Sequence, residues 1–369
     1  MFPLRTMGQL EDYYYGRNAM MRVMKADEPY LSTTTGIYNP IYGQKVWSQL
    51  NQEKNLFACL PKKVWDSTGW RVITARADTP PVGGIAEDGA IPETGKPTYA
   101  QIYTKPKLVA HSFAASEIDS FLSTVDDALN PMAAAREYFA IEHAEHINKM
   151  LLQNVTTLAG NNIDSIDRMI SSYSEVNGCA DVDADDADVF GLNRDAGATW
   201  ADAYVNHNSN TNRALSLDLI DTTLTNIRLN GGQPDLIVTG YDTLQRLQAL
   251  LQAQRRFGHA DEKMIVPTYN GVKGVPAEGY EGGFVVATYQ GIPIIPSKDV
   301  VDDGLSRMYF IDSRYMFLRI AKPTQYFETG VSTGNPFAID TFGDEGVYRT
   351  MAELVCVFFA AHGKLRDLE

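Results

Sequence analysis

The sequence predicts an α+β fold, because three kinds of pattern follow one another along the chain. A proline- and glycine-rich stretch lies between two β-rich segments, one long helical pattern follows it, and helices then alternate with strands before two long β segments. At about 150 residues per domain, the 369 residues indicate two or three domains. Hydrophobic residues make up 44% and charged residues 21%, which is typical of a folded globular protein.

The chain is acidic and poor in cysteine. Its 46 acidic and 32 basic residues leave a net charge of −14, which excludes proteins that hold nucleic acid tightly by neutralising phosphates. The 3 cysteines, Cys59, Cys179 and Cys356, are odd in number and far apart, so neither a disulfide framework nor a paired-cysteine zinc site is expected. A reducing compartment fits these features best.

The first 40 residues carry no sustained periodicity and are predicted to be an arm without a core of its own. Glu11 and Asp12 arrive before any apolar stretch of signal-peptide length. The longest apolar run, residues 354–361, is far shorter than the roughly 20 residues of a membrane-spanning helix. We therefore expect a soluble chain with no membrane partner. A short amphipathic helix is expected over residues 42–52.

A long protruding loop is predicted between the strand-like residues 70–77 and the β-rich residues 98–116. Its prolines and glycines prevent a helix or a central strand from persisting through it. These residues are Pro80, Pro81, Gly83, Gly84, Gly89, Pro92, Gly95 and Pro97. Such a loop inside a compact domain indicates a lid, a binding arm or an assembly element, and we favour an assembly element.

The clearest helix is expected over residues 130–153, with Asn130 as N-cap and Pro131 in the first turn. Further helices are expected at 216–229, which ends at an Asn-Gly-Gly sequence, and at 241–257, whose leucines share one face. The strands expected around and after them cover residues 235–240, 284–291, 291–297 and 306–313. Two long β segments, 316–329 and 347–360, are expected at the end of the chain.

We find no motif that predicts catalysis. Residues 330–334 match the Gly-x-Ser-x-Gly pattern of serine hydrolases, but Pro336 and a β-rich run follow where that pattern needs a helix. A hairpin turn is therefore the favoured interpretation, and catalysis by Ser332 is the alternative. Glycine-rich phosphate-binding motifs are absent from the sequence. We expect neither enzymatic activity nor a cofactor.

Metal sites are predicted weakly at most. Glu142, His143, Glu145 and His146 match neither common helical metal motif, so a solvated helix face is favoured. Separately, Asp181, Asp183 and Asp185 occupy the spacing of the first ligands of an EF-hand loop, but that loop's required glycine and final glutamate are missing. These aspartates are weak metal candidates, and a solvated acidic loop is the favoured interpretation.

The order of these parts resembles the major capsid proteins of tailed double-stranded DNA viruses, which have the Hong Kong 97-type fold. The resemblance rests on the order of loosely matching segments along nearly the whole chain. They are AEDGAIPETGKPTYAQIYTKPKLVAHSFAASEI, NPMAAAREYFAIEHAEHINKMLL, PDLIVTGYDTLQRLQAL, GIPIIPS and FIDSRYMFLRI with the C-terminal strand.

The resemblance implies a domain organisation. It assigns 1–68 to an N-terminal arm, 69–107 to an extended β-hairpin loop, 108–162 to a peripheral domain with a spine helix, 163–323 to an axial domain and 324–369 to strands returning to the peripheral domain. The loop would lie across a neighbouring subunit. The inter-subunit loop residues are then Pro80, Pro81, Gly83, Gly84, Glu87, Asp88, Pro92 and Lys96.

The resemblance also implies a structural role in a virion. Pentamers and hexamers would close an icosahedral shell around double-stranded DNA, which the acidic chain would contact weakly. Assembly in the host cytoplasm, with portal and separate scaffolding or decoration proteins as partners, is expected. Some relatives form lysine–asparagine cross-links, but no motif pairs Lys96 with a particular asparagine. The alternative is an encapsulin-like nanocompartment shell that encloses cargo enzymes.

Overall fold

The computed structural model describes most of the chain from residue 55 onward. The described residues are 55–75, 86–91, 95–125, 130–153, 161–182, 188–194, 198–252, 263–265, 284–286, 288–331, 333–334 and 342–369. They belong to two compact units. The smaller unit contains the described residues of Phe113–Tyr138 and Glu328–Glu345, and the larger contains those of Asn51–Ser112, Phe139–Phe327 and Gly346–Glu369.

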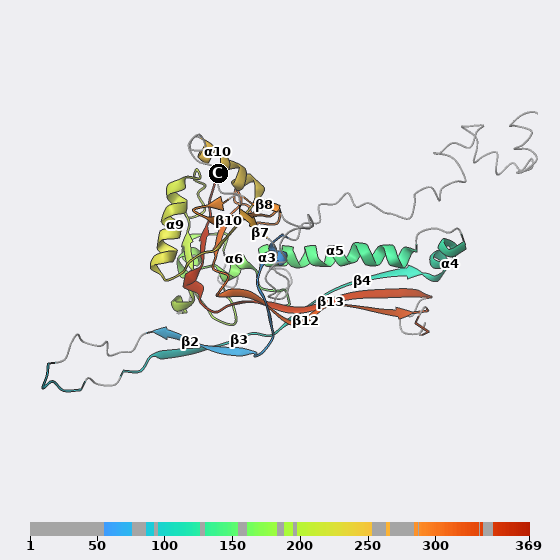
Figure 1. The fold of residues 1–369 in the computed structure, drawn as a ribbon, viewed down its shortest axis with the longest axis horizontal. Helices are drawn as coiled ribbons and strands as arrows, with labels where there is room; N and C mark the ends of the chain where they lie inside the picture. Colours follow the sequence, from blue (N-terminus) through green and yellow to red (C-terminus); the bar gives the residue numbers. More distant parts are fainter. Residues whose placement is uncertain are drawn as a thin grey trace, which may run out of the picture. The chain divides into compact units, whose positions relative to one another are not determined.

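The helices include one that is much longer than the others, α5 (Figure 1). The α-helices are α3 (Asn55–Cys59), α4 (Glu117–Val125), α5 (Pro131–Leu152), α6 (Ile166–Met169), α7 (Tyr173–Gly178), α9 (Leu217–Leu229) and α10 (Tyr241–Gln252). Short 3-10 helices are η3 (Thr199–Ala201) and η5 (Phe359–Ala361). Helices α5, α9 and α10 confirm the sequence prediction.

Local signals explain where α5 and α9 begin. The Asn130 side chain accepts hydrogen bonds from the backbone N–H groups of Met132 and Ala133, at 2.9 and 3.2 Å, which caps α5 as predicted. Ser216 caps α9 in the same way. Farther along α5, Ile147 and Leu151 are fully buried, so one face of the helix belongs to the core of the larger unit.

Among the described residues, the strands form four sheets. Their bounds are β1 (Lys62–Val64), β2 (Gly69–Ala75), β3 (Thr98–Tyr103), β4 (Lys107–Ser116), β5 (Tyr204–Asn206), β6 (Leu236–Thr239), β7 (Lys263–Ile265), β8 (Phe284–Val286), β9 (Thr288–Tyr289), β10 (Ile292–Pro296), β11 (Met308–Ile311), β12 (Met316–Gly330), β13 (Gly343–Cys356) and β14 (Gly363–Leu365). One sheet has the order β1-β12-β13-β4, and two sheets are the pairs β2-β3 and β7-β8.

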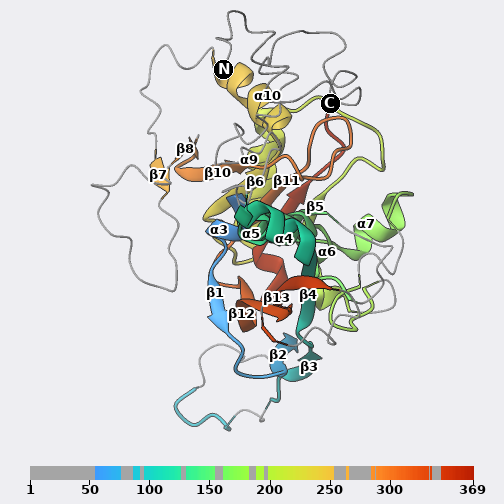
Figure 2. The same cartoon turned by 90° about the vertical axis from the view of Figure 1, so that its right-hand side faces the viewer.

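The remaining sheet has six strands in the order β5-β14-β11-β6-β10-β9. Strand β6 is buried along its whole length, parallel to β10 and antiparallel to β11. Helix α9 contributes Ile220, Leu224 and Ile227 to a core shared with this sheet. Figure 2 shows α9 and α10 grouped with these strands, which confirms the predicted alternation of helices and strands.

The predicted hairpin is the pair β2-β3, which Figure 1 shows as a ribbon extending away from the other strands of its unit. Its strands are antiparallel from Gly69↔Tyr103 to Ala75↔Thr98, with an irregularity between Ile73 and Ala75. Ile102 is fully buried at the base, whereas most positions farther out are exposed or half-buried.

Several elements were not predicted from the sequence, namely α3, α4, β1, β5, β7 and β14. The helix expected over residues 42–52 lies outside the described residues, and so do most of the arm and residues 76–85 and 92–94 of the predicted loop. The assigned domain boundaries stay predictions. In the described part of the chain, none of the helices combines the length and the apolar character needed to cross a membrane.

Candidate functional site

The base of the hairpin is held firmly in the larger unit. The Trp70 ring packs edge-on against Phe190 at 5.4 Å, and the Arg319 guanidinium lies 5.4 Å from the Trp70 ring centroid. Arg319 is itself 9% exposed and donates a 2.9 Å hydrogen bond to the Ser67 carbonyl at the entry to β2. These contacts fix the direction in which the hairpin leaves the core.

The hairpin presents apolar side chains to solvent on one face. Ile73 and Tyr99 lie opposite each other in the register and are 64% and 55% exposed, and Tyr103 is 62% exposed. A second cross-strand pair on the same face, Arg71 and Gln101, is polar and exposed. An isolated two-stranded ribbon is only marginally stable in water, so this face favours a partner surface.

The predicted inter-subunit residues are described only in part. Glu87, Asp88 and Lys96 are exposed, and the Gly89 N–H donates to the Ala86 carbonyl at 2.8 Å in a turn. The others lie outside the described residues, namely Pro80, Pro81, Gly83, Gly84 and Pro92. The sequence prediction missed Ile73 and Tyr99, although the alternation in the segment WRVITA could have pointed to an exposed apolar position.

A second exposed apolar surface lies in the smaller unit. In α4, Ile118, Phe121 and Leu122 are all exposed, and so is Phe342 in the same unit. The Phe342 carbonyl accepts a 3.3 Å hydrogen bond from the Glu117 N–H at the start of α4. Apolar groups gathered in this way are typical of a surface that another chain covers.

The larger unit contains a buried network of charges that joins the end of the chain to α6 and α7. Its cations are Arg307, Lys364 and Arg366, and its carboxylates are Asp167, Glu175, Asp181, Asp303 and Asp367. Lys364 and Arg366 are about 1% exposed, and both contact Glu175, at 2.7 and 2.9 Å. Because buried charges are costly unless paired, this network holds the C-terminal segment in place.

Asp167 is at the centre of this network. Arg307 donates two hydrogen bonds to its carboxylate at 3.0 and 3.1 Å, and Lys364 and Tyr309 donate to it at 3.1 and 2.9 Å. Burial alone would raise the pKa of Asp167, but Lys364 and Arg307 hold that pKa well below its usual range. The Asp167 carboxylate is therefore ionised, and its pairing is part of the folded structure.

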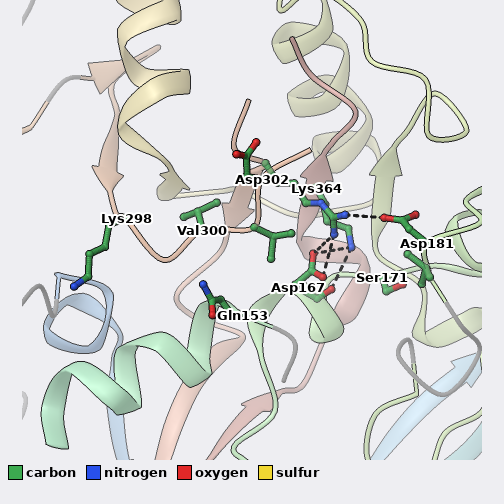
Figure 3. A pocket seen from close by; sticks show the side chains of 11 residues that line it. Gln153, Asp167, Ser171, Asp181, Lys298, Val300, Asp302 and Lys364 are labelled. Carbon is green, nitrogen blue, oxygen red and sulfur yellow. Dashed lines mark hydrogen bonds and ion pairs between the residues drawn. The ribbon is translucent and has the colours of Figure 1, made fainter. Parts of the chain in front are cut away.

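The predicted metal candidate Asp181 belongs to the same network. Its carboxylate accepts hydrogen bonds from Arg366 at 2.6 Å and from Arg307 at 3.2 Å. Asp181, Asp167 and Lys364 line a cavity of about 720 Å³, where Figure 3 shows them pointing toward one another. Asp183 and Asp185 lie outside the described residues, so cation binding at this loop stays a weak prediction.

The prediction that this face of the long helix is solvated is wrong at His143. His143 is 1% exposed, where its Nε2 lies 2.7 Å from the Thr350 Oγ1 and its Nδ1 lies 3.3 Å from the Nδ1 of His111. Glu145 pairs instead with Lys298, near the surface. The cause is the packing of α5 on β4 and β13, which the sequence of the helix alone does not show.

The position of Ser332 lies outside the described residues. Around it, β12 ends at Gly330 and β13 begins at Gly343, so the next described element is a strand and not the helix that a nucleophile elbow requires.

A family model described as SU10 major capsid protein matches residues 92–334 of this chain. The chain belongs to the SU10 major capsid protein family. It is therefore a capsid shell protein of a tailed bacteriophage, with a structural role in the virion. No curated protein matches the sequence significantly.

Solved structures agree on the fold of this capsid protein. The cyanophage A-1(L) capsid protein is similar with a TM-score of 0.62 at 14% identity, over 88% of this chain and 95% of that chain. The capsid of the native GTA particle has a TM-score of 0.53 at 13% identity, over 88% of this chain and 92% of that chain. The SrpI encapsulin from Synechococcus elongatus PCC 7942 has a TM-score of 0.50 at 10% sequence identity, over 96% of each chain. The predicted Hong Kong 97-type α+β fold is thus confirmed.

Proposed function

We propose that subunits of this capsid protein assemble through pentamers and hexamers into an icosahedral shell around double-stranded DNA, and that each hairpin lies across a neighbouring subunit. The observation that carries this proposal is the hairpin itself. Trp70 and Arg319 fix its base, while Ile73 and Tyr99 expose apolar surface farther out. Because both side chains are little more than half exposed, covering each contributes about 1–2 kcal/mol, and the contact is repeated around a closed shell.

The domain organisation in this proposal follows the resemblance. Residues 1–68 form an arm, 69–107 the extended loop, 108–162 the peripheral domain with α5 as its spine helix, 163–323 the axial domain, and 324–369 strands that return to the peripheral domain. The start of β2 at Gly69 and the end of α5 at Leu152 support this division.

The same proposal covers the partners. The net charge of −14 supports weak contact with packaged DNA, since a wall that gripped phosphates would impede packaging and release. Portal, scaffolding and decoration proteins would be separate chains, and assembly would take place in the host cytoplasm. The shell would carry no catalytic activity. A fluorophosphonate probe should therefore leave Ser332 unlabelled, and labelling of the folded protein would contradict this part of the proposal.

Two changes in the hairpin test the proposal. Deleting residues 80–97 should leave the subunit folded, as measured by circular dichroism, and should abolish closed shells in negative-stain micrographs. Replacing Ile73 and Tyr99 together by serine should also reduce shell formation without unfolding the subunit, because both side chains are exposed within it.

The control is the polar pair on the same face of the same strands. Replacing Arg71 and Gln101 together by serine removes similar side-chain volume and should change assembly far less. Equal loss of assembly in both double variants would contradict a specific apolar contact. Loss of subunit folding on deletion would show that the loop belongs to a core.

The encapsulin-like alternative is favoured only by the SrpI likeness. Treatment of purified particles with nuclease separates the two functions. Protected double-stranded DNA supports the viral shell, whereas particles that hold a protein cargo and no nucleic acid support the nanocompartment.

A further inference from the structure

Three side chains with metal-binding chemistry meet in the larger unit, away from the hairpin. Cys179 follows α7, His207 follows β5, and Asp367 lies at the end of the chain. Within the described part of the structure, they form the group in which a sulfur, a ring nitrogen and a carboxylate oxygen all lie within 4.8 Å of one another. Nothing in the proposed shell function uses this cluster.

The Asp367 carboxylate is held in one orientation. Asp367 is 1% exposed, and its Oδ2 accepts hydrogen bonds from the backbone N–H groups of Asn208 at 2.6 Å and Asn210 at 3.2 Å. Its Oδ1 accepts one from Arg366 Nε at 3.0 Å. The backbone φ angles of Ser209, Asn210 and Asp367 are 52°, 59° and 59°, a left-handed conformation that these residues adopt at a cost.

His207 is oriented by its two neighbours in α7. Ser174 Oγ lies 2.8 Å from His207 Nε2, and the ring lies over Gly178, where a Cβ atom would approach His207 Cε1 to 2.6 Å. Nδ1 accepts a long hydrogen bond, 3.4 Å, from Ser209 N. Metal-bound histidines commonly hydrogen-bond through the second ring nitrogen, as Nε2 does here with Ser174, so Nδ1 becomes the ligand atom once an ion displaces the long hydrogen bond from Ser209 N.

The donor set matches zinc. Thiolate sulfur, imidazole nitrogen and carboxylate oxygen are its usual ligands, and three protein ligands leave the fourth tetrahedral position for water. Zinc–nitrogen and zinc–sulfur distances of about 2.0 and 2.3 Å imply ligand atoms roughly 3.3–3.8 Å apart. The three ligand atoms, now within 4.8 Å of one another, would move closer on binding, and the half-buried His207 gives an ion access from solvent.

Zinc is bound by the thiolate form of cysteine, so binding at this cluster releases the Cys179 proton to solvent.

We propose that Cys179, His207 and Asp367 bind a zinc ion that ties the C-terminal segment of the subunit to α7 and to the segment after β5. Such a link joins residues far apart in the sequence. It would stabilise the folded subunit to an extent that depends on the free zinc concentration.

The test uses assembled full-length protein, stripped with a chelator, dialysed and titrated with Zn²⁺ alone. Elemental analysis after gel filtration should give one zinc per subunit, and the unfolding temperature should rise. Replacement of zinc by Co²⁺ should produce a thiolate-to-cobalt charge-transfer absorption. No zinc above the background of a blank protein, or a cobalt spectrum without the thiolate band, would overturn the proposal.

Matched variants assign the ligands. Cys179→Ser and His207→Gln should each weaken zinc binding at least tenfold, whereas Cys59→Ser, which changes a half-buried thiol outside the cluster, should leave it unchanged. His207→Gln keeps the test valid if Cys179→Ser does not fold, because His207 is only half-buried. Zinc binding by His207→Gln as tight as that of the unchanged protein would refute the assignment.

Discussion

At the scale of single residues, two histidines are buried in the folded subunit although histidine is a polar residue. His143 is buried against Thr350 and His111, and burial lowers its pKa to about 4, with its electrostatic interactions with His111 and His146 adding to this effect. His362 is buried completely, and burial lowers its pKa to about 4 as well, although Asp312 opposes the shift. Both rings are therefore neutral in the folded subunit at physiological pH.

These histidines predict a loss of stability in acid. The unfolded chain binds a proton near pH 6.5, whereas folded His143 binds one only near pH 4, so the free energy of unfolding falls as the pH drops between these values. For His143→Gln, we expect the loss between pH 7 and pH 5 to be smaller by about 2 kcal/mol than in the unchanged protein. Urea titrations at both pH values measure the difference, and identical pH dependence in the two proteins would contradict it.

The buried ion pairs predict a contrast between two lysines. Lys364→Met removes one of the two buried cations that contact each of Asp167 and Glu175, while Arg307 and Arg366 remain, and should lower the free energy of unfolding by up to about 3–5 kcal/mol. Lys298→Met removes the more exposed pair with Glu145 and should cost at most about 1 kcal/mol. Chemical denaturation of both variants tests the contrast, and equal effects would show that the network is not essential.

At the scale of elements, a helix or strand could be predicted from the sequence where the residues that determine it lie within its own segment. Helix α5 could be predicted because Asn130, Pro131 and the spacing of Ile147 and Leu151 all lie within the segment itself. Strand β14 could not, because its three residues are ordered by pairing with β5 and β11, which are distant in sequence. The two strands of the hairpin were predicted in outline. The exposed pair Ile73 and Tyr99 could not be predicted, because it depends on the register between β2 and β3.

The cap of α5 gives a prediction at this scale. Asn130→Ala removes the acceptor for the Met132 and Ala133 N–H groups and should lower the free energy of unfolding by about 1 kcal/mol. Asn130→Ser keeps a capping oxygen and should cost only a few tenths of that. Thermal unfolding of the two variants measures the difference, and equal stability would show that the cap contributes nothing.

At the scale of the whole molecule, one subunit leaves apolar side chains exposed that its own chain does not cover. Exposed apolar side chains recur on the hairpin, at Ile73, Tyr99 and Tyr103, and on α4. Part of the acidic charge, by contrast, is neutralised inside the subunit, because several carboxylates form ion pairs with Arg307, Lys364 and Arg366. A subunit of a shell has these properties, because its neighbours complete its core.

We infer that each hairpin is covered by a neighbouring subunit in the assembled shell. Cryo-electron microscopy of shells assembled from the full-length protein tests it directly. We predict that Ile73, Tyr99 and Tyr103 contact an adjacent subunit and lose most of their exposure. Hairpins that remain free in solvent in a closed shell, or that fold back on their own subunit, would contradict it.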